Sequence, residues 1–179
     1  MKWNLDTTHS AVDFAVKHLM ISTVKGNFTT FTGTGETSRD GTVKSVSLDI
    51  DAASINTNQA QRDDHLRSPD FFDATTFPKI TFKSSKIEQK GIVVTITGDL
   101  DMHGVKKPVT LLGEVTPVVK DPWGNQRLGL TASAKLNRKD WGLQWNQVLE
   151  AGGVAVAEEV RFNVEVEAVG VPEEALVAA

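Results

Sequence analysis

Alternation of apolar and polar residues is the feature that most restricts what this chain can fold into. In residues 159–169 an apolar side chain stands at every second position, from Val160 and Phe162 through to Ala168, and charged or amide side chains fill the positions between them. A β-strand with one buried face and one solvated face has this period of two. Strands of this kind are typical of antiparallel sheets, so the sequence predicts an all-β fold.

Seven other segments alternate in the same way, which gives eight predicted strands. They cover residues 10–18, 24–36, 43–55, 79–88, 92–102, 105–119, 127–138 and 159–169. Within the second segment the alternation changes parity between Phe28 and Phe31, which indicates a bulge or a corner. Turn-forming pairs such as Asp40-Gly41 and His103-Gly104 lie between neighbouring strands.

Eight one-sided strands joined by turns predict an antiparallel sheet closed into a barrel, and a sandwich of two sheets is the alternative. We expect one short helix over residues 59–67, with Thr57 or Asn58 as its N-cap and Pro69 beyond its end. The sequence contains no linker or repeat that would divide it. We therefore expect a single domain of residues 1–171 and a loose C-terminal tail of residues 172–179.

The charge and the missing residue types exclude several classes of function. The chain has 19 Lys and Arg against 23 Asp and Glu, a net charge of -4, so we expect no nucleic acid partner. Its 179 residues include no cysteine, which rules out thiolate catalysis and cysteine-ligated zinc. No apolar run is long enough for a transmembrane segment and no secretion signal is seen, so we expect a cytoplasmic protein.

Motifs for catalysis and for metal binding are also missing from the sequence. The histidines, His9, His18, His65 and His103, show no metal-ligand spacing, so we expect neither a metal nor a cofactor. No nucleophile motif or phosphate-binding loop marks a reaction centre. We therefore expect that the protein is not an enzyme.

The inward faces of the predicted strands contain small residues where a filled barrel would need bulky ones. These residues are Gly26, Gly33, Gly35, Gly98, Gly113, Ala132 and Ala134. A barrel of eight strands either fills with its own side chains or encloses one small ligand. The small residues favour an apolar cavity, and a filled core with glycines at its bends is the other interpretation.

Several segments, in order along the chain, resemble one known family. They are residues 3–18 (WNLDTTHSAVDFAVKH), 24–28 (VKGNF) with Phe31 and Gly33, 64–73 (DHLRSPDFFD) with Phe77-Pro78 and Phe82, 98–100 (GDL), 103–111 (HGVKKPVTL), and Arg138 with Trp141-Gly142. The chain resembles the YceI-like family, lipocalin-like proteins that bind polyisoprenoids or other lipid chains. The resemblance implies an extended eight-stranded antiparallel barrel, a helix across one opening, a hydrophobic tunnel and a capacity to form a homodimer. It implies no catalytic centre.

Large apolar side chains on the inward faces are the candidates for contact with such a ligand, and plain core packing is the alternative for each of them. On the strands they are Phe14, Val16, Phe28, Phe31, Leu48, Ile50, Phe82, Ile96, Leu100, Leu111, Leu130, Val160 and Phe162. Each methylene group of a buried lipid tail contributes about 0.8 kcal/mol and needs no polar partner. We therefore expect specificity at the mouth of the barrel.

Aromatic residues near the strand ends are candidates for covering that mouth. Phe71 and Phe72 follow the predicted helix, and Trp141 and Trp145 lie in the long loop of residues 139–156. Each pair is expected to form either a fixed plug or a mobile lid. The sequence favours a plug for the phenylalanines and a lid for the glycine-containing loop.

Two polar candidates continue the inward parity of their strands, namely His18 and Arg138. We expect them to meet the head group of the ligand, and surface solvation or a salt bridge is the alternative for Arg138. The sequence thus predicts a barrel that binds a polyisoprenoid, fatty acid, amide or related lipid for sequestration, storage or transport. One alternative is an enzyme acting on such a lipid through a mouth cluster, His65 with Asp64 or His18 with Arg138. Another is a barrel that serves as a scaffold for protein interaction.

Overall fold

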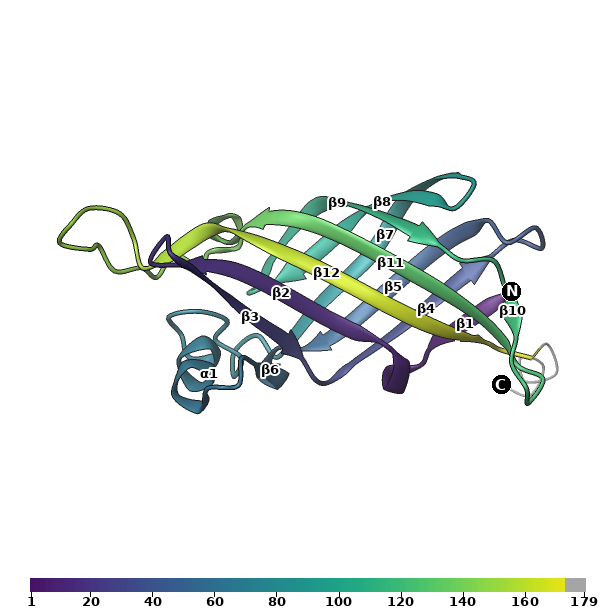
Figure 1. The fold of residues 1–179 in the computed structure, drawn as a ribbon, viewed down its shortest axis with the longest axis horizontal. Helices are drawn as coiled ribbons and strands as arrows, with labels where there is room; N and C mark the ends of the chain where they lie inside the picture. The colour runs from purple at the N-terminus through teal and green to yellow at the C-terminus, as the bar shows by residue number, and fades with distance from the viewer. Residues whose placement is uncertain (173–179) are drawn as a thin grey trace.

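The computed structural model describes residues 1–172, and most of them belong to one antiparallel β-sheet. The predicted tail of residues 172–179 lies outside the described residues from residue 173 onward. Long strands run obliquely along an extended barrel, with the α-helix at one end and the N-terminus at the other (Figure 1). We call these the helix end and the N-terminal end.

The sheet contains 12 strands within the described residues. In chain order they are β1 (Lys2–Leu5), β2 (Ala11–His18), β3 (Ser22–Phe28), β4 (Phe31–Thr37), β5 (Val43–Asp51), β6 (Ile55–Asn56), β7 (Lys79–Lys90), β8 (Val93–Met102), β9 (Val105–Val115), β10 (Val119–Lys120), β11 (Gln126–Asn137) and β12 (Val156–Gly170). The single α-helix of this part of the chain is α1 (Ala60–Arg67).

Two of the barrel strands are interrupted, and β6 and β10 are two-residue additions at the ends of the sheet order. The remaining assignments form the eight strands of a closed barrel. Both β1 and β2 pair with β12, and the 3-10 turn Thr7–His9 separates them. Both β3 and β4 pair with this first interrupted strand, and residues 29–30 form the corner between them. Pairing of β11 with β12 closes the sheet. The predicted eight-stranded barrel is confirmed, and the sandwich alternative is wrong.

The predicted strand boundaries fail mainly where a tight turn breaks a strand. The strand predicted over residues 43–55 ends at Asp51, whose carboxylate accepts a hydrogen bond from the Ala53 amide and caps a 3-10 turn. Strand β1 is absent from the sequence prediction because four residues are too few to show a period. It matters for the core, since Trp3 is buried and its Nε1 donates to Thr37 Oγ1 at 3.0 Å.

Helix α1 covers the helix end of the barrel, but its N-cap differs from the prediction. The side chain of Gln59, rather than that of Thr57 or Asn58, accepts the hydrogen bond from the Arg62 amide. Thr57 instead donates from its amide and its hydroxyl to the buried carboxylate of Asp63. These bonds fasten the helix to the segment that follows β6. None of the helices described is both long and apolar enough to cross a bilayer.

Three of the predicted small inward residues make room for neighbouring groups rather than for a ligand. A side chain at Gly26 would overlap the ring of Phe14, and one at Gly98 would come within 2.6 Å of the ring of Phe82. At Gly113 the backbone of β11 lies too close for a Cβ atom. The small residues that do line a cavity are Gly33, Gly35 and Ala132.

Candidate functional site

An apolar cavity occupies the part of the barrel nearest the N-terminal end. Its wall runs from Trp3 and Val43 to Leu100 and Phe162, and the space inside it that a water-sized molecule can occupy measures about 110 Å³. The inward side chains of this first cavity are almost all hydrocarbon.

A second apolar cavity of about 780 Å³ of empty space lies at the helix end. Four residues line both cavities, which places the two next to each other inside the barrel: Ile50, Leu100, Leu136 and Phe162. Along β12 the lining runs from Val156 in the second cavity to Ala168 in the first, about 40 Å of tilted strand at about 3.3 Å per residue. The barrel thus contains a long apolar path.

Most of the ligand-contact candidates line one of these cavities. The first cavity includes Leu48, Ile50, Phe82, Ile96, Leu100, Leu111, Leu130 and Phe162. The second includes Phe14, Val16, Phe28, Phe71, Phe72, Arg138 and Val160, and it shares Ile50, Leu100 and Phe162 with the first. Contact of any of them with a ligand stays a prediction.

Four candidates lie outside both cavity linings: His18, Phe31, Trp141 and Trp145. Phe31 is buried in the core, opposite Ile50 in the register of β4 and β5. His18 is exposed and pairs with Ser22 where β2 and β3 form a hairpin. Inward parity fails for His18 because the hairpin reaches beyond the region where opposite strands enclose a core.

Arg138 is the polar group of the second cavity, and its side chain is only 4% exposed. Its guanidinium donates from Nε to the Ala157 carbonyl at 2.9 Å and from Nη1 to the Leu143 carbonyl at 2.6 Å. A bulge in β12 between Val156 and Val160 supplies the first of these acceptors. Instead of the salt bridge considered for it, Arg138 binds backbone carbonyls.

Burial shapes the electrostatics of Arg138 as well. Desolvation lowers the pKa of the guanidinium from its ordinary value, and the nearby charge of Glu158 acts in the opposite direction. Glu158 itself is held by Lys139, at 2.6 Å between Oε1 and Nζ. A guanidinium remains charged in a protein. The second cavity therefore has a cation in its wall whose protein partners are neutral.

The aromatic residues of the long loop close the helix end. Trp141 is buried and donates from Nε1 to the Leu100 carbonyl at 3.1 Å. The Trp145 ring packs against His65 at 4.7 Å and against Phe71 at 5.3 Å between centroids. The loop therefore rests on the helix and on the segment after it, and the choice between a lid and a plug stays a prediction.

Sequence reasoning missed several residues of the cavity walls. Leu143 is buried in the second cavity, and Trp3, Leu5 and Val43 line the first. Leu143 lies between Trp141 and Trp145, at the same spacing of two that marks the strands, and that signal could have identified it. Trp3 and Leu5 lie in the four-residue strand β1, which is too short to show a period. Val43 begins β5 with the parity opposite to that of Leu48 and Ile50, at a point where the register with β4 shifts.

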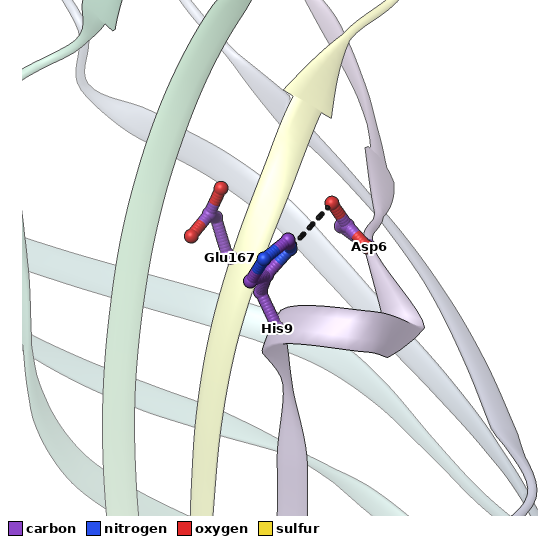
Figure 2. Close-up of side chains that lie close together, drawn as sticks. All are labelled: Asp6, His9 and Glu167. Atoms are coloured by element: carbon purple, nitrogen blue, oxygen red, sulfur yellow. Dashed lines mark hydrogen bonds and ion pairs between the residues drawn. The ribbon is translucent and has the colours of Figure 1, made fainter. Parts of the chain in front are cut away.

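A cluster of possible metal ligands, Asp6, His9 and Glu167, lies near the N-terminal end (Figure 2). His9 Nδ1 is 3.0 Å from Asp6 Oδ2, and Arg127 Nη1 is 2.8 Å from Asp6 and 2.6 Å from Glu167. Hydrogen bonds from Thr8, His9 and Arg127 keep the pKa of Asp6 well below its usual range, although burial opposes them. Because Arg127 pairs with both carboxylates, we assign this cluster to the ion pairing that joins the residue after β1 to β11 and β12.

The polar pairs considered for an enzyme are not assembled at the cavities. His65 Nε2 lies 2.8 Å from Asp70 Oδ2, while Asp64 pairs with Arg67 at 3.0 Å. Among the described residues that line the second cavity, Arg138 is the only ionisable one. The geometry therefore gives no support to the pairing of His65 with Asp64 as an acid–base centre.

Comparison with known proteins supplies the family of this barrel. The sequence profile of the YceI-like domain matches residues 3–168. The chain belongs to the YceI-like family. A UPF0312 protein of Staphylococcus aureus strain N315 is 36% identical to this YceI-like protein over 168 residues, which cover 92% of the present chain and 95% of the relative.

Solved structures agree with this placement. The YceI protein of Campylobacter jejuni superposes with a TM-score of 0.76 and 31% identity, over 87% of this chain and 90% of that one. A polyisoprenoid-binding domain of Saccharophagus degradans has a TM-score of 0.73 and 17% identity, over 94% and 98% of the two chains, and shows the same fold. The family resemblance found in the sequence is confirmed.

Proposed function

We propose that this YceI-like protein binds a long apolar chain, a polyisoprenoid or a related lipid, along its two adjoining cavities. The observation that carries the proposal is the apolar path from Val156 to Ala168, which suits a ligand that is long and narrow. A barrel of the same fold is described as a polyisoprenoid-binding domain, which supports this ligand class. Sequestration, storage and transport would all use this one site.

We further propose that the polar end of the ligand lies beside Arg138. The guanidinium has five N–H groups. Three of them donate hydrogen bonds to the carbonyls of Leu143, Val156 and Ala157. Arg138 makes no ion pair within the described residues, and a carboxylate or a phosphate would supply one. The homodimer and the cytoplasmic location stay predictions.

Native mass spectrometry of the purified protein, followed by organic extraction, tests the binding itself. We expect a discrete adduct whose extracted mass is that of a long-chain lipid. A protein that carries no adduct and takes up neither added polyprenyl compounds nor added fatty acids would contradict the proposal.

Replacement of Arg138 tests the orientation of the ligand. Arg138→Met should weaken binding of a long-chain acid much more than binding of the alcohol of equal length, and Arg138→Lys should keep part of the difference. Arg67→Met is the matched control, because that guanidinium lies outside the second cavity and binds Asp64 with the carbonyls of Ala53 and Ile55. Equal losses for acid and alcohol would refute the placement of the polar end.

A further inference from the structure

The turn between β2 and β3 exposes apolar side chains at the helix end of the barrel. Met20 is 65% exposed and Ile21 is 82% exposed, and Leu19 precedes them at 37%. The Ile21 amide donates to the His18 carbonyl at 3.0 Å, so Leu19 and Met20 are the two central residues of a tight hairpin turn. We call residues 19–21 the hairpin tip.

The backbone of the hairpin tip makes its apolar sequence unusual. Leu19 has a φ of 52° and Met20 a φ of 59°, and a two-residue turn with positive φ at both positions strongly prefers Asn-Gly or similar pairs. Large apolar residues in this conformation are uncommon. Since neither side chain is buried in the barrel, the fold itself gives no reason for apolar residues at this position.

A second apolar tip, residues 148–154, lies beside the first. The loop before β12 forms its own small hairpin, in which Val148 bridges to Val154, and Val148 is 79% exposed. The Leu19 amide donates to the Ala155 carbonyl at 2.8 Å and so ties the two tips together. Both project from the same end of the molecule (Figure 1).

Positive charge lies behind the tips on the outer face of the barrel. Lys17 precedes the hairpin tip by two residues, about 7 Å of strand. Lys25 of β3 and Arg161 of β12 are both paired with Ala15 of β2, one on each side of it. All three cations are exposed and make no ion pair within the described residues.

Two glutamates at the start of β12 have lysine partners: Glu158 pairs with Lys139 and Glu159 with Lys135. Glu150 adds one negative charge to the second tip. The apolar side chains of the two tips can enter the interface of an anionic bilayer, and the unpaired cations farther along the barrel can meet its head groups.

The sheet also has an unpaired edge beside the hairpin tip. Strand β3 has a partner on its outer side only at Asn27 and Phe28, where β6 pairs with it, so Ser22 to Gly26 form a free edge among the described residues. Val16, two residues before the end of β2, lines the second cavity. A membrane at the tips would therefore lie beside this edge, whose neighbouring strand β2 contributes Val16 to the cavity wall.

From these observations we infer that the two tips dock the protein onto an anionic lipid bilayer, with the helix end facing the membrane. Exchange of ligand with that bilayer rests on the proposed function, but docking does not, because the tips and the cations are present whether or not the cavity is filled. A protein partner or a second copy of this chain are the other occupants that the test must separate.

A single-cysteine experiment tests the docking directly, since the chain has no cysteine of its own. An environment-sensitive fluorophore on Met20→Cys should shift to the blue with vesicles of equal parts phosphatidylcholine and phosphatidylglycerol, and much less with phosphatidylcholine alone. Trp123→Cys is the matched control, because Trp123 is 81% exposed in the turn before β11, at the N-terminal end. Its label should not respond.

Substitutions then separate the apolar from the charged contribution. Met20→Ser with Ile21→Ser should weaken vesicle binding by about tenfold or more, and Lys17→Gln with Lys25→Gln by about tenfold at low salt. Lys44→Gln, on β5, should change nothing. Thermal unfolding verifies that each variant is folded, and lipid extraction reports separately on the cavity.

Several results would overturn the docking. They are no response of the Met20→Cys label to either vesicle, an equal response at position 123, and binding that both substitution pairs leave intact. A response to rising protein concentration without vesicles would assign the tips to a second copy, and a response to lipid-free cell extract but not to vesicles would assign them to a protein partner.

Discussion

A bulky residue at Ala132 should shorten the apolar path without touching its polar end. Ala132 is buried on β11, lines the first cavity and lies opposite Val164 of β12. Arg138, by contrast, belongs to the second cavity. In Ala132→Trp the indole would fill the barrel at this level and separate its N-terminal part from the rest.

The size of the effect follows from the length that is cut off. Four residues separate Ala132 from Leu128, the last lining residue of β11 in that direction, which is about 13 Å of strand. If about five methylene groups of a ligand lose their apolar surroundings at about 0.8 kcal/mol each, the loss is about 4 kcal/mol, or about a thousandfold in Kd.

Ligands of graded chain length measure this loss. The Kd of the longest ligand should rise about a thousandfold in Ala132→Trp, while ligands short enough to remain in the second cavity keep their affinity. Ser133→Trp is the matched control, because Ser133 is the next residue along the strand and faces solvent. Ala132→Phe provides a smaller plug if overpacking, at about 1–3 kcal/mol, unfolds the larger one.

The reasoning would be refuted in two ways. Equal losses for short and long ligands would show that the indole disturbs the whole barrel or that the chain does not extend past Ala132. Unchanged binding of the long ligand in a folded Ala132→Trp protein would show that the first cavity does not hold it.

Three further predictions concern stability. Gly98→Ala should lower the free energy of unfolding by about 1–3 kcal/mol, because the added methyl group meets a backbone carbonyl and an aromatic ring. Gly35→Ala should lower it less. Urea unfolding measures both variants, and equal losses of unfolding free energy would contradict this prediction. Although burial opposes the shift, hydrogen bonds lower the pKa of Asp121 to about 2, so stability present above about pH 4 is lost as the pH falls toward 2. Arg127→Gln removes one of those hydrogen bonds, so the difference in Tm between wild type and variant should become smaller as the pH falls from about 4 toward 2. A difference in Tm that does not change with pH would contradict this prediction. Trp141→Phe should lower the free energy of unfolding by about 1–3 kcal/mol, since a buried carbonyl loses its donor, and an unchanged Tm would count against that role.

The fold could be predicted because the barrel repeats one local rule. Every long strand has one face inside and one outside, so the period of two identified both the strands and the residues, such as Phe162, that face inward. The rule needs several residues to be visible. It therefore missed β1, where Trp3 closes the core with four residues of strand.

The candidate site could be predicted only in part, because parity gives a direction and not a depth. His18 has the parity of Val16 yet lies exposed, since the hairpin extends past the enclosed part of the barrel. Gly26 has inward parity yet leaves no space, because the Phe14 ring of the neighbouring strand lies over it. Such outcomes depend on register between strands, which a single sequence does not encode locally.

Ile50, Leu100, Leu136 and Phe162 line both cavities and so lie where the two adjoin. Under the proposed function, a guest that fills both cavities would lie against all four side chains. Its cross-section would then matter as well as its length: a flexible linear chain could extend from one cavity into the other, whereas a fused-ring molecule of the same hydrophobicity would fit there less well.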